Sequence, residues 1–254
     1  MKSGKLINLL ISLVAAIVFG LIIYGIGSIV SEESGAYRIL ELMGANLPSG
    51  FIQILTYFLF LYGILEILRM NKQANLEEHA FSLGLLPEQE QYVLSAEDVA
   101  QIKLKMVELG RGNPYLLVET IKRACTQFRA NKSVAETLDV VSAHTNLLSR
   151  NSDSEQALIR YVAWAIPSIG FIGTVIGIAS SLGAANQVTT QEGIKAVTSL
   201  LNVAFDTTLV ALILSIVLMF FYHLLQERVE KLHANIEDYV MENLVNRIYH
   251  REPV

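Results

Sequence analysis

Residues 166–184, IPSIGFIGTVIGIASSLGA, are apolar enough to enter a bilayer, but their composition is unusual for a membrane anchor. The stretch contains one proline, four glycines, one threonine and three serines. A helix that only holds a protein in lipid needs none of these residues. Small residues at steps of three or four let a second backbone approach closely, which is how helices associate in lipid. The stretch therefore predicts a membrane helix that packs tightly against another helix.

The rest of the chain has the composition of a membrane protein with a water-exposed part. It has 254 residues, of which 52% are hydrophobic and 17% are charged, and its mean hydropathy is +0.44. Segments of about 20 apolar residues cross the hydrocarbon layer as helices, and four segments qualify: 6–30, 51–68, 161–185 and 200–225. No segment alternates like a strand. We therefore expect an all-α integral membrane protein with four transmembrane helices.

Charged residues beside these segments predict the topology. Basic residues flank one side of the membrane: Lys2, Lys5, Arg69, Lys72, Arg150, Arg160, Arg228 and Lys231. The segment between the first two spans has three acids and one base: Glu32, Glu33, Glu41 and Arg38. By the positive-inside rule, both termini and the region 69–160 are cytoplasmic. The first apolar run is too long for a signal peptide and is read as a retained span.

Four regions follow from this layout. Residues 1–68 are two membrane helices with a short outer loop, and residues 69–160 are a cytoplasmic helical domain. Residues 161–225 are the second pair of membrane helices, and residues 226–254 are a cytoplasmic C-terminal helix. Glu66, one turn before Arg69, is interpreted as a helix-end residue that reaches the interface.

Local signals divide the cytoplasmic region into helices. Ser95 to Asp98 indicates a helix start, Pro114 suits the first turn of a second helix, and Ser133 to Glu136 is a capping box that opens a third. After the fourth span an apolar seam recurs at steps of three and four: Leu225, Val229, Leu232, Ile236 and Tyr239. The last helix is therefore expected to continue into the cytoplasm and to pack on the 69–160 helices or on a sister subunit.

The third and fourth spans each carry a face of small residues. On the third span the face contains Gly170, Gly173, Gly177, Ser180 or Ser181, and Ala184; on the fourth it contains Ala204, Thr208, Ala211 and Ser215. Thr174 borders the first face. Its hydroxyl has two interpretations, since threonine in a span often bonds back to a carbonyl one turn earlier.

Polar side chains inside the two spans predict a functional level. At 1.5 Å per residue, Thr174 and Thr208 lie about 20 Å and about 18 Å above the cytoplasmic side, so they reach nearly the same depth. Asp206 and Thr207 add a carboxyl and another hydroxyl. A carboxylate in a span costs about 2.5–3.5 kcal/mol and is seldom without a role. The alternatives for Asp206 are a contact between helices and a position near the outer interface.

These two spans resemble the MotA/TolQ/ExbB proton channel family over roughly residues 160–225. PSIGFIGTVIGIASSL is similar to the family pattern Pro-x-x-G-x-x-G-T-V-x-G. NVAFDTTLVALILS is similar to the pattern Ala-x-x-x-Thr-x-x-Gly-Leu, with Ala211 at the usual glycine. Four spans with a large insert between the second and third resemble the MotA-like layout. Two positions depart from the family, because Trp164 stands where some flagellar-type members have an acid and Asp206 is outside the usual motif.

The resemblance implies a homo-oligomeric ring, typically a pentamer, in the bacterial inner membrane. The ring would surround a MotB/TolR/ExbD-like partner with a single span, whose membrane Asp takes up the ion. By position, Thr174 and Thr208 are the pore threonines, Thr207 is their neighbour, and Pro167 lies near the cytoplasmic end of the third span. The translocated ion would be H⁺, with Na⁺ as the alternative.

Other functions have less support in the sequence. A passive scaffold would account for the small faces but not for hydroxyls at matching depth. An enzyme would need a nucleophile–base or metal arrangement, which the pattern lacks, so we expect no enzymatic activity, metal or cofactor. Nucleic acid binding would need a basic patch, whereas the net charge is −5. Cys125, the one cysteine, suits a small, semi-buried position in an amphipathic helix.

Overall fold

The computed structural model describes residues 2–31, 34–45, 50–89, 91–112, 114–184 and 190–248. The predictions that involve Glu32, Glu33, Ala185, the side chain of Lys2 and residues 249–254 lie outside this part. The helices of the described chain are α1 (Lys2–Gly27), α2 (Gly35–Leu42), α3 (Phe51–His79), η1 (Ala80–Leu83), α4 (Ala96–Gly112), α5 (Leu116–Asn131), α6 (Val134–Ala184), α7 (Gln191–Asn243) and η3 (Val245–Arg247).

Four of these helices are long and apolar enough to cross a membrane, which confirms the all-α membrane fold and the four spans. The helices extend further than expected. The helix predicted to begin after Ser133 and the third span form one helix of 51 residues, α6, and α7 has 53 residues. The linking residues 149–160 contain neither glycine nor proline, so nothing interrupts the backbone hydrogen bonds between the two predicted elements.

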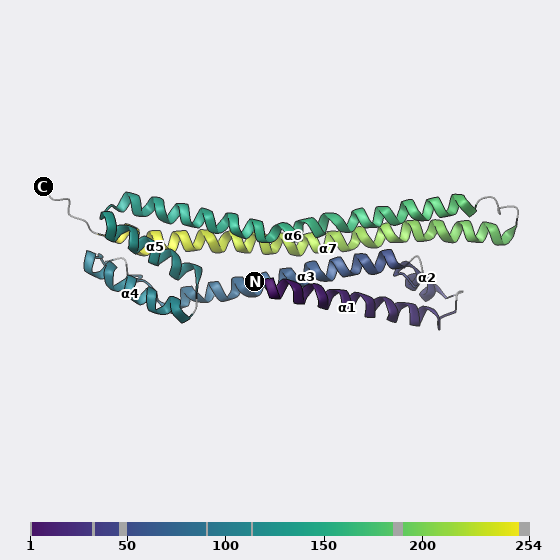
Figure 1. Ribbon diagram of the computed structural model, residues 1–254, viewed down its shortest axis with the longest axis horizontal. Helices are drawn as coiled ribbons and strands as arrows, with labels where there is room; N and C mark the ends of the chain where they lie inside the picture. Colours follow the sequence, from purple (N-terminus) through teal and green to yellow (C-terminus); the bar gives the residue numbers. More distant parts are fainter. Residues whose placement is uncertain are drawn as a thin grey trace. The chain divides into compact units, whose positions relative to one another are not determined.

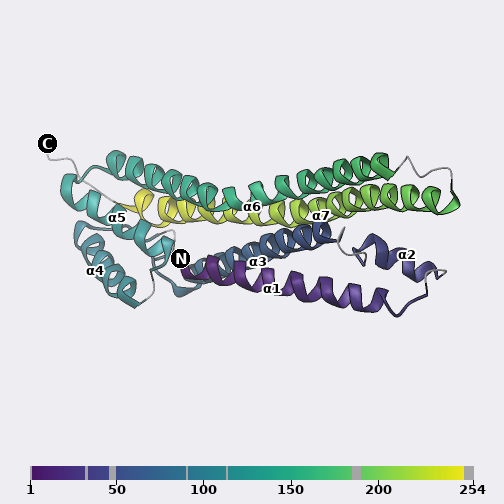
Figure 2. The same cartoon turned by 45° about the vertical axis from the view of Figure 1, so that its right-hand side comes forward.

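Contacts within the chain divide it into two compact units. The first, unit 1, contains Met1–Arg69 and Ala157–His223, and the second, unit 2, contains Met70–Gln156 and Leu224–Val254. Each unit therefore combines segments that are far apart in the sequence. Helices α6 and α7 run side by side in opposite directions in both views (Figures 1 and 2).

Unit 1 includes a short helix that was not predicted, α2, in the segment between the first two spans. The Ser34 hydroxyl caps its first turn by accepting from the Ala36 amide at 3.2 Å. At its other end the Tyr57 hydroxyl on α3 donates to the Met43 carbonyl at 3.0 Å. Gly44 then adopts φ +101°, a left-handed conformation that favours glycine. Helix α2 is therefore held in unit 1 by contacts at both of its ends.

Glu66 lies within α3 and not at a helix end, because the helix continues to His79. Its carboxylate accepts from the Asn8 amide at 2.9 Å and from the Arg69 guanidinium at 2.8 and 3.0 Å. The side chain is buried. The interpretation of Glu66 as a helix-end residue is wrong, since the ion pair with Arg69 forms one turn along the same continuous helix.

Unit 2 has an apolar core to which α5 and the end of α7 contribute. Leu117, Ile121 and Phe128 of α5 are buried with Leu232 and Ile236 of α7. The seam predicted along the last helix thus packs on the chain's own helices from the region 69–160, which confirms one of the two expectations. One half of the predicted capping box is present, since the Glu136 amide donates to the Ser133 hydroxyl at 3.2 Å. The Glu136 carboxylate instead accepts from the side-chain amides of Gln127 and Asn131.

Two buried histidines in unit 2, outside the four apolar segments, predict a loss of stability in acid. Both ring nitrogens of His144 and Nδ1 of His233 are buried without a hydrogen-bond partner in the described residues. Burial lowers the pKa of both rings. As pH falls below about 6.5, the two rings take up protons in the unfolded chain before they do so in the folded one. The free energy of unfolding therefore falls by at most about 1.4 kcal/mol per pH unit for each ring.

Hydrogen exchange of the α5 amides measures this effect, with the rates corrected for intrinsic exchange at pH 7.5 and 5.5. We expect weaker protection at pH 5.5, and a smaller difference in His144→Leu, which removes one titrating ring. Replacing the exposed His79 by leucine is the control and should leave the difference unchanged. Equal protection of the native protein at the two pH values would contradict the prediction.

Candidate functional site

Three glycines of α6 lie directly against α7. A Cβ added at Gly170 would overlap the Cβ of Ala211, and one at Gly177 would lie 2.6 Å from the Cβ of Ala204. At Gly173 an added Cβ would lie 2.5 Å from the Thr207 hydroxyl oxygen. These distances are too short for any side chain larger than hydrogen. Glycine therefore lets the two backbones approach closely enough for hydroxyls of one helix to reach carbonyls of the other.

Pro167 lies inside α6 and does not end it. Proline has no amide hydrogen, so the carbonyl four residues earlier, that of Ala163, loses its usual helical donor. The Ser215 hydroxyl of α7 donates to this carbonyl at 3.0 Å, and Ser215 is buried. A partner helix thus satisfies the freed carbonyl, as membrane helices with proline require.

Thr174 and Thr208 meet between α6 and α7. Their hydroxyl oxygens are in hydrogen-bonding contact. The Thr174 hydroxyl also lies 3.0 Å from the carbonyl oxygen of Ala204 on α7, and the Thr208 hydroxyl lies 3.1 Å from the carbonyl oxygen of Gly170 on α6. We call the two hydroxyls and these two carbonyls the threonine level.

The contacts across the helices are shorter than those within each helix. The Thr174 hydroxyl is 3.5 Å from the Gly170 carbonyl one turn earlier, and the Thr208 hydroxyl is 3.4 Å from the Ala204 carbonyl. At both residues, the hydrogen bond to the carbonyl of the other helix thus has the better geometry than the bond back to the same helix.

The threonine level has more acceptors than donors. Each hydroxyl has one hydrogen and two lone pairs, so two hydrogens are shared among two hydroxyl oxygens and two carbonyls. Thr174 and Thr208 are both half-buried. Their remaining lone pairs can accept a hydrogen bond from water or from a protonated group, or coordinate a small cation.

Thr207 occupies a different position from its neighbour. Its side chain is buried, and its hydroxyl donates to the Ala204 carbonyl at 2.9 Å. It lines a small cavity of about 60 Å³ in unit 1, which Ile52, Gly173 and Ser180 also line. Ser181 is buried, and its hydroxyl donates to the Val197 carbonyl at 3.3 Å. Thr207 and Ser181 therefore face the helix interface.

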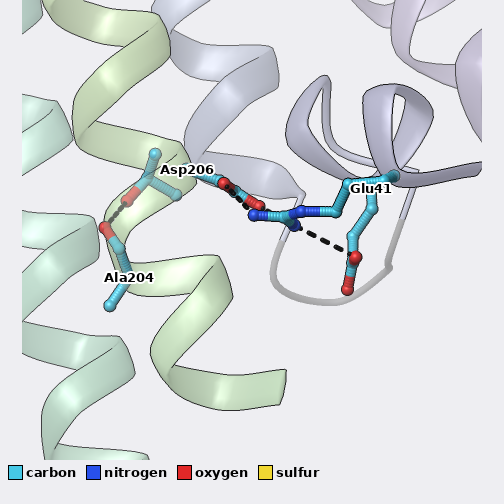
Figure 3. A network of polar contacts seen from close by, with 5 residues as sticks. Glu41, Ala204 and Asp206 are labelled. Atoms are coloured by element: carbon cyan, nitrogen blue, oxygen red, sulfur yellow. Dashed lines mark hydrogen bonds and ion pairs between the residues drawn. The ribbon is translucent and has the colours of Figure 1, made fainter. Parts of the chain in front are cut away.

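Asp206 does not join the threonine level but pairs with α2. The Arg38 guanidinium donates to its two carboxylate oxygens at 2.6 and 2.8 Å, and to Glu41 at 3.1 Å. Figure 3 shows Asp206 pointing toward Glu41 through this network, with Ala204 on the opposite side of α7. The Asp206 side chain is 4% exposed. Its buried carboxylate is therefore neutralised by the Arg38 guanidinium, which binds both of its oxygens.

Two contacts of the site were not predicted from the sequence: Arg38 with Asp206, and Ser215 with the Ala163 carbonyl. Arg38 is the one basic residue between the first two apolar segments, and Asp206 is the one acid in the middle of a span. Their opposite charges were a usable signal for the ion pair. Ser215 was assigned to a small face, but its bond to the carbonyl freed by Pro167 depends on the register of two helices. No pattern within one helix carries that register.

A comparison with protein families matches residues 116–238 to the MotA/TolQ/ExbB proton channel family. The match extends beyond residues 160–225 on both sides, from α5 to residue 238 of α7. No curated protein and no solved structure matches the chain. Over residues 116–238, which contain both α6–α7 motifs, this multi-pass membrane protein matches the MotA/TolQ/ExbB proton channel family.

Proposed function

We propose that this chain is the ring-forming subunit of an inner-membrane proton channel that converts ion-motive force into mechanical work. It acts with a partner subunit that has a single span and a membrane Asp. The contact between the Thr174 and Thr208 hydroxyls is the observation that carries the proposal. A passive scaffold gains nothing from two hydroxyls held together at hydrocarbon depth.

The geometry of the threonine level suits a group that exchanges protons. The two hydroxyls have lone pairs beyond those used by their two hydrogens, and the carbonyls of Gly170 and Ala204 fix the positions of the oxygens. A protonated carboxyl of the partner can donate to a hydroxyl, and its deprotonated form can accept from one. Each change of charge on the partner thus alters its hydrogen bonds to the ring.

Such a difference in binding is what lets proton transfer drive movement. A bound ion shifts an assembly between two states only by the difference in its affinity for them. Protonation and release of the partner's carboxyl alternate its contacts with successive subunits of the ring. The termini and the 69–160 region are on the cytoplasmic side in this proposal, which the basic flanks of the spans support.

Purification of the intact complex in mild detergent tests the assembly. We expect native mass spectrometry to find several copies of this chain, five in the simplest case, with copies of a protein that has one span. Thr208→Val is the matched control and should give the same assembly, because valine keeps the shape of threonine. A purified chain that is monomeric and has no membrane partner would contradict the proposal.

A further inference from the structure

The side chain of Asp206 lies on the face of α7 opposite to Thr208. At about 100° per residue, two residues are separated by about 200° around the helix. Thr208 is directed at α6, where it meets Thr174, and Asp206 is directed at α2, where it meets Arg38. α7 is thus held on two opposite faces within less than one turn.

The contact with α2 strongly prefers one rotation of α7. Asp206 is buried, and the two oxygens of its carboxylate accept from two nitrogens of one guanidinium. A bidentate pair of this kind requires defined positions of both partners. Any rotation that moves Asp206 away from Arg38 leaves a charged group among apolar side chains, which is strongly unfavourable.

The helix that carries Arg38 is itself fixed. Leu40 and Met43 pack on a cluster that includes Val210 of α7 and Tyr57 of α3, and the Tyr57 hydroxyl donates to the Met43 carbonyl. The Arg38 side chain is 48% exposed while that of Asp206 is 4% exposed. The guanidinium therefore reaches from an anchored outer helix toward a buried acid.

We infer that Arg38 is a positioning residue for the threonine level, because its ion pair with Asp206 sets the rotation of α7 that brings Thr208 to Thr174. Arg38 and Asp206 carry no ion in this assignment, since the guanidinium already occupies both carboxylate oxygens. The inference deepens the proposed function and rests on it only for the consequence on ion flux. Its geometric content is independent of that function.

Disulfide cross-linking in the full chain tests the geometry directly. In Thr174→Cys/Thr208→Cys the two thiols replace the contacting hydroxyls, and an oxidant that enters the membrane joins them. Cys125 is the one native cysteine. It is buried, and burial raises the pKa of its thiol to about 12, so it does not compete. Mass spectrometry after alkylation of free thiols gives the initial rate of cross-linking.

We expect rapid cross-linking in the otherwise native protein and a rate lower by at least about fivefold when Arg38→Gln is added. Adding Asp206→Asn to that variant should bring the rate back to within about twofold, since the paired charges are then both absent. Glu41→Gln is the matched control. It keeps an acceptor for the guanidinium and should change the rate by less than about twofold.

Three outcomes would overturn the inference: no cross-link in the native background, a native rate in Arg38→Gln, or no recovery in Arg38→Gln/Asp206→Asn. If the Arg38→Gln protein does not accumulate in membranes, recovery of its amount by Asp206→Asn supports the same pair, and absence of recovery counts against it. Cross-linking needs no ion gradient. Suppose that the cross-linking rates are as expected but that proton flux is the same in every variant. That result would reject the proposed function, and the positioning role of Arg38 would remain supported.

Discussion

Thr208→Val is expected to abolish proton flux while the protein still assembles. Valine has nearly the same shape as threonine, but it removes the hydroxyl that contacts both Thr174 and the Gly170 carbonyl. One neutral hydrogen bond contributes about 0.5–1.5 kcal/mol to stability, which a large helical membrane protein tolerates. The transport step loses one of its two hydroxyls, and a barrier higher by about 1.4 kcal/mol already slows it about tenfold. We expect a decrease of at least that size.

Flux in inverted membrane vesicles, followed with a pH-sensitive dye, measures this prediction. Thr198→Val on the same helix is the matched control, because the Thr198 hydroxyl is exposed and bonds back to the Ile194 carbonyl at 2.8 Å. The control should keep native flux. Native flux in Thr208→Val itself would reject the assignment of Thr208 to the ion path.

Gly170→Ala is expected to destabilise the packing of α6 on α7 by about 1–3 kcal/mol, the usual effect of an extra group in a packed site. The added Cβ overlaps the Cβ of Ala211 and lies 3.1 Å from the Thr207 carbonyl oxygen. Neither the methyl group nor the backbone can turn aside, so the helices must separate. Separation also lengthens the contact between Thr174 and Thr208, and flux should fall with stability.

Restoring the lost space should reverse this effect. The family pattern has glycine where this chain has Ala211, so Gly170→Ala/Ala211→Gly exchanges the positions of the methyl group and the hydrogen. We expect the double variant to regain most of the thermal stability, which in the single variant falls by about 2–10 °C. Gly183→Ala is the control, because nothing lies within 4 Å of its added Cβ. A stable Gly170→Ala would show that the helices are not in close contact.

The four spans and the extended last helix were predictable because apolar length and helical periodicity are local properties. The equal depth of Thr174 and Thr208 also followed from residue counts along two antiparallel helices. The prediction of a separate cytoplasmic helix after Ser133 placed a boundary where α6 has none. The helix expected after Ser133 and the span expected from residue 161 were treated as two elements, whereas residues 149–160 contain no glycine or proline that would end a helix.

Helix α2 and its ion pair with α7 were not predictable in the same way. Arg38 and Asp206 are far apart in the sequence, and their contact requires that α2 fold back on α7. The sequence left two alternatives for Asp206, a contact between helices and a position near the outer interface, and named no partner for it. The donor that Ser215 supplies to the Ala163 carbonyl likewise depends on the register between α6 and α7. Such contacts depend on how the helices pack, which the pattern of one helix does not reveal.

Proton uptake by proteoliposomes tests the central claim most directly. The purified complex of this chain with its single-span partner is reconstituted, and a membrane potential is imposed while the internal pH is recorded. We predict uptake above that of empty liposomes for the native complex, and none above that level for Thr174→Val or Thr208→Val. Uptake equal in the native complex and in both valine variants, or absent from the native complex, would contradict the account.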